Sequence, residues 1–246
     1  MQALMMNTQL MISSILNHAE SNFPEVEMVS VTVDNPQHRQ NNKTFAKRCR
    51  QLANVLDSLG AEFGDRIGTL AWNDHRHMEL YYAVSGSGMV CHTINPKLFP
   101  EQVTYIINHA EDKVLFVDVL VMPLLEALKE HLSKVETIVV LTTKENMPET
   151  SLTNVACYEE LLAAQSDDYD WAQFDENTAS GMCYTSGTTG NPKGVVYSHR
   201  STVLHALAGA LPDVTRASNM ETSLPVVPMF HVNAWGAPYA ALMVGM

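Results

Sequence analysis

The sequence has little that would cross-link the chain or attract nucleic acid. Its 246 residues include four cysteines, which are widely separated and form no CxxC pair, so neither a disulfide framework nor a zinc site is indicated. Only 15 lysines and arginines stand against 27 aspartates and glutamates, and the formal charge of −12 argues against a broad phosphate-backbone surface. We therefore predict no nucleic-acid partner and expect any phosphate ligand to be bound locally.

A basic leader and a long apolar run are also missing. The first lysine or arginine is Arg39, so the Met-rich opening lacks the positive segment of a secretory signal, and no apolar run is long enough to span a bilayer. We predict a cytoplasmic protein without a transmembrane segment. The opening MQALMMNTQLMISSIL suggests a docked arm or helix whose apolar side carries Leu10, Ile12, Ile15 and Leu16.

Strand-like and helix-like runs alternate from residue 66 to residue 143. RIGTLAW, MVCHTIN, KVLFVDV and TIVVLTT are typical of strands, whereas HMELYYAVSGSG, PEQVTYIINHAE and PLLEALKEHLSKV have helical spacing. With 46% hydrophobic residues, the chain has enough apolar material for a substantial core. The pattern predicts an α/β fold with layered, mostly parallel sheets flanked by helices.

An acidic stretch from residue 144 to residue 177, with a short helix at YEELLAA, suggests a subdomain boundary. We predict that residues 1–178 form the N-terminal arm and a first α/β subdomain, and that 179–246 begin a second one. Its strands are expected at SGMCYT, GVVYSH and SLPVVPMF, with a helix at STVLHALAGAL. Because the final apolar helical run AWGAPYAALMVGM has no polar tail, we expect the second subdomain to be incomplete and the chain to be truncated.

The stretch YTSGTTGNPKG, residues 184–194, suits neither a helix nor a strand interior. A glycine-rich loop between strands can turn backbone N–H groups toward one point, and its hydroxyl groups add donors without bulk. Lys193 would add a positive charge, and the Thr185 hydroxyl would reach a magnesium ion. From composition alone, a polyphosphate site and an ordinary surface turn both remain open.

Two common phosphate-loop and hydrolase motifs do not fit this stretch. The Walker A spacing fails, because the fifth residue after Gly187 is Pro192 and the fifth after Gly190 is Val195. A G-x-S-x-G elbow around Ser186 fails as well, which removes the main support for a serine hydrolase.

Continued by VVYSHR, this stretch closely resembles the signature loop of the adenylate-forming family, which includes acyl-CoA synthetases, luciferases and peptide-synthetase adenylation domains. The resemblance implies that the ATP phosphates are held by Thr185, Ser186, Gly187, Thr188, Thr189, Gly190 and Lys193. It also implies that Thr185 is the magnesium contact.

The run PVVPMFHVNAWG is similar to the family's next motif, in which an aromatic residue and a histidine lie beside the carboxylate substrate. FHVNAWG is most similar to medium- and long-chain fatty acyl-CoA synthetases. The likeness implies a substrate site of His231, Val232, Asn233 and Trp235, with the Trp235 indole closing an acyl tunnel. From the residues alone, Trp235 in ordinary core and His231 as a hydrogen-bonded structural histidine stay open.

The resemblance therefore implies an ATP-dependent fatty acid–CoA ligase that uses ATP, Mg²⁺ and coenzyme A. Thr185, Lys193 and His231 would act in catalysis by positioning groups and neutralising phosphate charge rather than by proton transfer. The sequence ends before the family's later motifs and its C-terminal catalytic lysine. We expect this piece alone not to complete thioester formation.

Other interpretations remain open at this stage. One is a non-catalytic nucleotide- or phosphate-binding module, another is a dimerisation module, and a third is a ligase for short-chain or aryl acids. The N-terminal arm either forms a homodimer, as in some relatives, or folds onto its own subunit. His75 and His77 form an HxH pattern, but side chains two apart on a helix diverge, so we interpret them as helix-end residues.

Overall fold

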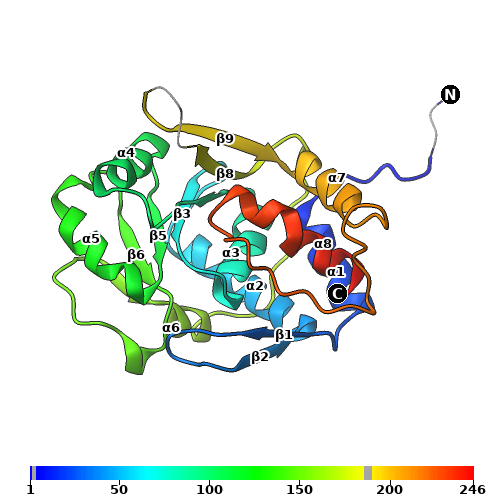
Figure 1. The fold of residues 1–246 in the computed structure, drawn as a ribbon, viewed down its shortest axis with the longest axis horizontal. Coiled ribbons are helices and arrows are strands. Elements are labelled where there is room, and N and C mark those ends of the chain that lie inside the picture. The colour runs from blue at the N-terminus through cyan, green and yellow to red at the C-terminus, as the bar shows by residue number, and fades with distance from the viewer. Residues whose placement is uncertain (2–3, 186–189) are drawn as a thin grey trace.

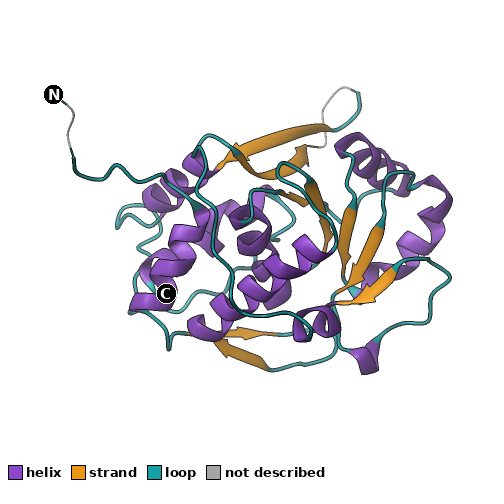
Figure 2. Cartoon of the chain, turned by 180° about the vertical axis from the view of Figure 1, so that it is seen from behind, coloured by secondary structure: helices purple, strands orange, loops and turns teal. Residues whose placement is uncertain are grey.

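The computed structural model describes residues 1, 4–185 and 190–246, and Figures 1 and 2 show them from opposite sides. The α-helices are α1 (Ile12–Asn22), α2 (Asn42–Ser58), α3 (His75–Gly86), α4 (Pro100–Ala110), α5 (Met122–Leu128), α6 (Tyr158–Ala163), α7 (His199–Gly209) and α8 (Ala237–Val244). The strands are β1 (Glu27–Ser30), β2 (His38–Asn41), β3 (Arg66–Leu70), β4 (Val90–Thr93), β5 (Val114–Val117), β6 (Thr137–Val140), β7 (Val155–Cys157), β8 (Ala179–Thr185) and β9 (Lys193–Ser198). The short 3-10 segments are η1 (Val119–Val121), η2 (Lys129–His131), η3 (Lys144–Asn146) and η4 (Val232–Gly236).

A seven-stranded sheet in the order β7-β6-β5-β3-β4-β8-β9 forms the centre of the molecule. All neighbouring strands from β7 to β8 run parallel, and β9 turns back antiparallel on β8. The predicted mostly parallel α/β sheet is therefore confirmed. A separate two-stranded hairpin of β1 and β2 lies beside the helices (Figure 1).

Both faces of the central parallel strands are buried, as parallel strands require, whereas the antiparallel edge strand β9 is mostly exposed. Along β5, Val114 and Phe116 enter the hydrophobic core formed with α1, α2 and α3. Leu115 and Val117 point the other way into a second core with α4 and α5. The period-2 alternation of a strand thus gives two apolar faces, which explains why the strands have nearly continuous hydrophobic sequences.

Several helices begin at a residue whose side chain accepts a hydrogen bond from a free backbone N–H group of the first turn. The Asp74 carboxylate accepts a hydrogen bond from the backbone N–H of His77 (2.8 Å), and Asn41 does the same for Thr44 (2.9 Å). At α4, Pro100 occupies the first turn, where no N–H is needed. These caps fix where α2, α3 and α4 begin after their strands.

The predicted strand SLPVVPMF is wrong, because this segment is extended chain outside any sheet. Pro225 and Pro228 have no N–H to donate to a strand ladder. The Asn73 side chain forms hydrogen bonds with the backbone of the segment instead. It donates to the carbonyl of Pro225 and accepts from the N–H of Met229. Residues 223–230 therefore form a strap that the Asn73 side chain helps to hold.

The N-terminal helix is confirmed, and its apolar side is buried. Ile12 and Leu16 are fully buried in the core, and the backbone N–H of Ile12 donates to Nδ1 of His199 on α7 (3.2 Å). Before this helix, Leu4 and Met5 are exposed, and the arm leads away from the body (Figure 1). The four cysteines are buried free thiols.

The acidic connection is partly ordered structure, with β7 at the edge of the sheet and the predicted helix YEELLAA present as α6. After the connection, β8 pairs with β4, so residues 179–185 extend the sheet that the earlier strands build. The division of the chain at residues 178 and 179 stays a prediction. Within the described ranges, no helix combines the length and apolar composition needed to cross a bilayer.

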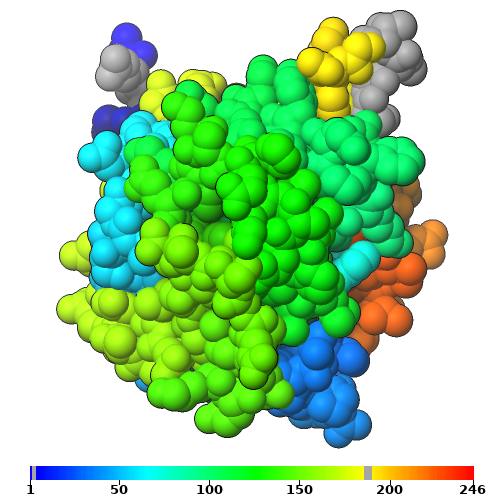
Figure 3. All heavy atoms as spheres, turned by 90° about the vertical axis from the view of Figure 1, so that its left-hand side faces the viewer, coloured from blue at the N-terminus to red at the C-terminus, as the bar shows by residue number. Residues whose placement is uncertain are grey.

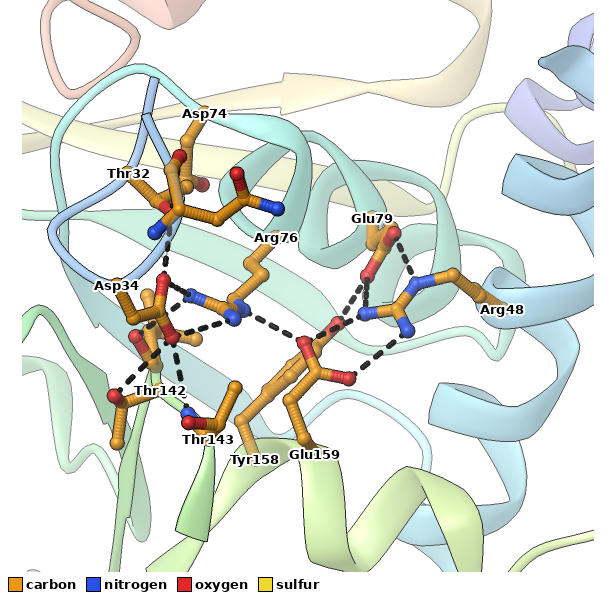
Figure 4. Close-up of polar contacts among 12 residues, drawn as sticks. Thr32, Asp34, Arg48, Asp74, Arg76, Glu79, Thr142, Thr143, Tyr158 and Glu159 are labelled. Atoms are coloured by element: carbon orange, nitrogen blue, oxygen red, sulfur yellow. Dashed lines mark hydrogen bonds and ion pairs between the residues drawn. The ribbon is translucent and has the colours of Figure 1, made fainter. Parts of the chain in front are cut away.

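Charged side chains from α2, α3, α6 and the loop after β1 meet inside the protein (Figure 4). Arg76 of α3 is 4% exposed and forms ion pairs with Asp34 (2.9 Å) and Glu159 (2.8 Å). Burial alone would raise the pKa of Asp34, but hydrogen bonds from Arg76 and Thr32, with the Arg76 charge and the Thr143 N–H, hold it well below its usual range. These contacts join the loop after β1 to α3, α6 and the end of β6.

A second arginine extends this group. Arg48 of α2 pairs with Glu79 (2.7 Å) and with Glu159 (2.9 Å), and the Tyr158 hydroxyl donates to Glu79 (2.6 Å). Glu159 is therefore shared by two guanidinium groups, Arg48 and Arg76 (Figure 4). We call Asp34, Arg48, Arg76, Glu79, Tyr158 and Glu159 the interior network. Because each charge has a buried partner, the network avoids the high cost of an isolated interior ion.

Candidate active site at the carboxyl edge of the sheet

Three central strands end at the same edge of the sheet, which is where open α/β sheets bind ligands. Since β3, β4 and β8 run parallel, Leu70, Thr93 and Thr185 mark their carboxyl ends. Both predicted motifs begin at or pack against this edge.

The two ends of the predicted phosphate loop are adjacent in the structure. Thr185, the last residue of β8, pairs with Lys193, the first residue of β9, and both side chains are exposed. Gly190 has a φ of +94°, a left-handed conformation that favours glycine, and open space where a Cβ would stand. Ser186, Gly187, Thr188 and Thr189 lie outside the described residues. Figure 3 shows the described flanks of this hairpin (yellow) standing above the surface of α4 and α5 (green).

Tyr184 anchors the start of this hairpin to α4. Its hydroxyl lies 2.6 Å from Nδ1 of His109, and burial raises the pKa of Tyr184 to about 12, so the hydroxyl stays protonated at neutral pH. The facing Gly194 leaves room for the phenol, because a Cβ there would lie 3.2 Å from the Tyr184 Cζ. The ring also packs on His92, which hydrogen-bonds the buried Asp112 (2.8 Å).

The strap, residues 223–230, is held by side chains of the loop after β3 and of α3. Asn73, just after β3, donates to the carbonyls of Pro225 (3.1 Å) and Val227 (2.9 Å) and accepts from the N–H of Met229 (2.6 Å). The Tyr81 hydroxyl donates to the Met229 carbonyl. These contacts fix the backbone at the entry to Phe230 and the residues that follow it.

The four predicted acid-site residues occupy one turn with different exposures. His231 is exposed and Val232 is partly buried. The Asn233 side chain is 8% exposed and points toward the sheet, with its Oδ1 3.5 Å from Oγ1 of Thr93. The Trp235 indole is 64% exposed. The turn therefore presents Trp235 and His231 outward while Asn233 anchors it to β4.

The backbone of this turn, η4, is left-handed from Val232 to Gly236. The φ angles are 48°, 48°, 50°, 56° and 75°, and only the last belongs to a glycine. Left-handed backbone costs an ordinary residue about 1–2 kcal/mol, so this segment is strained. Such strain persists where surrounding contacts determine the conformation, and it is concentrated at functional sites.

The acid motif and the phosphate hairpin meet the same strand at different points. A Cβ at Gly181 of β8 would lie 3.1 Å from the Asn233 amide, so the turn packs where β8 has no side chain. Thr185 lies four residues further along β8, about 13 Å at the usual strand rise.

His75 and His77 do not share a ligand position. His77 is fully buried and its ring bonds Oγ1 of Thr69 and the carbonyl of Trp72, both at 3.0 Å. His75 stacks on His38 with ring centres 3.5 Å apart. Burial lowers the pKa of both to about 4, so both are neutral at pH 7. In the part of the chain that the structure describes, no cluster of three His, Cys, Asp or Glu side chains could hold a metal ion.

Sequence reasoning missed the side chains that support these motifs. Asn73 is one of several polar residues that follow a strand-like run, and His109 and His205 lie inside helical runs, so none of the three has a local signal of its contacts. The sequence does signal the left-handed turn through Asn233 and Gly236, two residue types that tolerate positive φ.

Comparisons with known proteins identify the family of this chain. The sequence profile of the AMP-binding enzyme family matches residues 17–246. The chain is 50% identical over 241 residues to the 3-methylmercaptopropionyl-CoA ligase of Ruegeria lacuscaerulensis, covering 98% of this chain and 45% of the relative. It is also 50% identical over 241 residues to the medium-chain-fatty-acid–CoA ligase of Ectopseudomonas oleovorans, covering 98% and 44%. The chain belongs to the AMP-binding enzyme family, as the resemblance predicted.

A solved structure shows the same fold. The anthranilate CoA ligase AuaEII, in complex with anthranoyl-AMP, matches with a TM-score of 0.83 at 23% identity, covering 100% of this chain and 45% of AuaEII. The present chain spans less than half the length of the relatives it matches.

Proposed function

We propose that the whole protein is an AMP-forming acid–CoA ligase and that its acid is a medium- or long-chain fatty acid. The observation that carries this proposal is the hairpin of β8 and β9, which puts Thr185 and Lys193 side by side and exposed at the carboxyl edge of the sheet. The family implies ATP and CoA as substrates.

The residues of this edge fit a polyphosphate. The Thr185 hydroxyl and the Lys193 ammonium are a small donor and a compact cation, and Gly190 leaves space next to the backbone. Thr185 would also be the ligand of Mg²⁺, which neutralises charge on phosphate oxygens when it is bound. We propose that Ser186, Gly187, Thr188 and Thr189 complete this set.

The proposed reaction has two halves. First, a carboxylate oxygen attacks the α-phosphorus of ATP and pyrophosphate leaves, giving an acyl-adenylate. Then the CoA thiol attacks the acyl carbonyl and AMP leaves, giving the thioester. For this chain we propose that Lys193 holds phosphate, that His231 orients the carboxylate or phosphate, and that Val232, Asn233 and Trp235 form the acid site.

A fatty-acid substrate is supported by the apolar surroundings of this edge. Phe230 packs edge-on against Trp72 with ring centres 5.7 Å apart, and the indole of Trp235, five residues later, is exposed. Apolar walls with few polar groups are typical of acyl sites. The two relatives are equally identical to this chain, but their names give different acyl groups. The acid has to be determined by experiment.

The test is pyrophosphate release by the whole protein with acids from propionate to palmitate and with benzoate. We expect a maximum at a medium or long chain and a loss of about 100-fold in kcat for Thr185→Ala, a magnitude typical of losing one group that stabilises developing charge. Thr153→Ala, at an exposed threonine before β7, is the control and should keep full rate.

The outcomes separate the alternatives. ATP binding without pyrophosphate release for any acid would replace the ligase by a non-catalytic nucleotide-binding module. A maximum at propionate or benzoate would replace the fatty acid by a short-chain or aryl acid. Full activity of Thr185→Ala would remove Thr185 from the magnesium role.

We further propose a cytoplasmic homodimer in which the N-terminal arm contacts a second copy. Leu4, Met5 and Met6 are exposed in this arm, and free apolar side chains on an extension are suited to docking. Deleting residues 1–8 should convert a dimer into a monomer in light scattering. An unchanged molar mass would show that the arm is not the interface.

A further inference from the structure

The left-handed turn η4 needs a partner to keep its shape. Val232, Asn233, Ala234 and Trp235 all have positive φ angles, and of these four residue types only asparagine tolerates this region well. The turn must therefore be held by contacts with other elements.

One contact holds the turn from the sheet side. The Asn233 side chain packs against β8 at Gly181, where a Cβ would approach its amide nitrogen to 3.1 Å. Next to it, Ala234 is 1% exposed in the core. These residues fix the inner side of the turn and leave the main chain at Trp235 to be fixed from elsewhere.

The other contact comes from α7. Nε2 of His205 lies 3.0 Å from the main-chain carbonyl oxygen of Trp235. A carbonyl only accepts hydrogen bonds, so His205 must carry its proton on Nε2 and donate. Gly236 completes the fit, because a Cβ there would lie 2.7 Å from Cδ2 of His205. The imidazole thus occupies space that only a glycine at position 236 leaves free.

We propose that His205 is a positioning residue for the acid site: its hydrogen bond to the Trp235 carbonyl keeps η4 left-handed and determines where the indole stands. This rests on the proposed function, in which Trp235 borders the acid site. His205 acts through the main chain, so it affects the acid without touching it. The side chain that contacts the acid is Trp235, which is 64% exposed while Ala234 and Gly236 on either side are buried.

The first test observes Trp235 directly. Incorporation of 5-fluorotryptophan into the whole protein gives one ¹⁹F line per tryptophan, and single Trp→Phe variants at Trp72, Trp171 and Trp235 assign these three lines. We expect His205→Ala to shift the Trp235 line and leave the other two in place. His205→Gln retains an N–H donor and should restore the line, and His131→Ala, at an exposed histidine of η2, should change nothing.

The second test measures the acid in the whole protein, with octanoate as the probe. His205→Ala should raise the KM for octanoate about tenfold, the factor expected from losing one hydrogen bond, and leave the KM for ATP unchanged. His205→Gln should recover most of the loss. A general loss of fold would instead lower kcat and affect both substrates.

A double-mutant cycle tests the contact with Gly236. Gly236→Ala should shift the Trp235 line strongly when His205 is present and less in the His205→Ala background, because the collision with the imidazole is then gone. Gly60→Ala, at a glycine with the same φ of +75° and open space around it, is the matched control.

Three results would overturn the proposal: an unmoved Trp235 line in His205→Ala, a defect in His205→Gln as large as in His205→Ala, or strict additivity in the cycle. Failure of the ligase assignment would look different. In that case the whole protein would release no pyrophosphate with any acid, while the ¹⁹F comparison would still decide the role of His205.

Discussion

The interior network and the carboxyl edge of the sheet are both rich in polar side chains, yet they differ in exposure. In the network, Arg76 and Asp34 are almost fully buried and pair with each other. At the edge, Thr185, Lys193 and His231 are exposed. The difference indicates two roles for polar side chains. A side chain whose charge is neutralised inside the protein supports the fold, whereas a side chain exposed at the edge of the sheet is available to a ligand.

The largest effect on stability is expected inside the network. Glu79→Ala leaves the Arg48 guanidinium without its closest carboxylate and should lower the free energy of unfolding by about 3–5 kcal/mol, measured by urea unfolding. Glu27→Ala removes a solvent-exposed partner of Arg39 and should cost less than about 1 kcal/mol. Equal losses in the two variants would abolish the distinction between interior and surface charge.

Acid should weaken the interior next. Burial lowers the pKa of His75, His77 and His199 to about 4, below the ordinary 6.5, so these rings are neutral when folded and become protonated first in the unfolded chain. Stability is therefore full above pH 6.5 and falls as the pH drops toward 4, by up to about 3 kcal/mol for each histidine.

The slope of unfolding free energy against pH between 7 and 5 checks this. His75→Phe should make the slope shallower, since one protonation in the unfolded chain is lost, whereas His131→Phe at the surface should leave it as it is. A His75→Phe slope equal to wild type would mean that His75 does not contribute.

Asn73 lies in the loop that joins β3, which ends at the carboxyl edge, to α3, which carries Arg76 and Glu79 of the interior network. We expect a smaller change in free energy from its substitution than from Glu79→Ala. Asn73→Ala removes three hydrogen bonds from the strap and should speed hydrogen exchange of the Met229 amide by about 10- to 100-fold, or ~1.4–2.8 kcal/mol. Asn146→Ala, at an asparagine whose side chain donates to the nearby Thr143 hydroxyl, is the control. Unchanged exchange at Met229 would show that other contacts hold the strap.

The smallest effect on stability should come from the edge itself. Lys193→Ala should change the free energy of unfolding by less than about 0.5 kcal/mol, as surface substitutions do, while weakening ATP binding in calorimetry. A loss of stability above that range would assign Lys193 to the fold and blur the contrast with Glu79.

The central sheet could be predicted because each strand and helix carries its own pattern. β5 reads as a continuous apolar run between a helix and a loop, and the loop after β8 has a composition of its own. The strap was mispredicted because its conformation depends on Asn73, about 150 residues earlier, rather than on local alternation. Likewise, the interior network joins Asp34 to Glu159 through Arg76, and no local window contains all three.

The packing of α1 against α8 has a consequence for synthesis. The two helices are about 215 residues apart in the chain, and a ribosome adding about 5–20 residues per second needs roughly 10–40 s to reach the second after finishing the first. During that time the side of α1 that α8 will cover has no partner. The same holds for Phe23, whose ring packs against Gly245 in the folded protein. Of the described helices, α1 is made first, yet its apolar side is covered only after α8 has been made, and a nascent-chain chaperone has that interval in which to bind it.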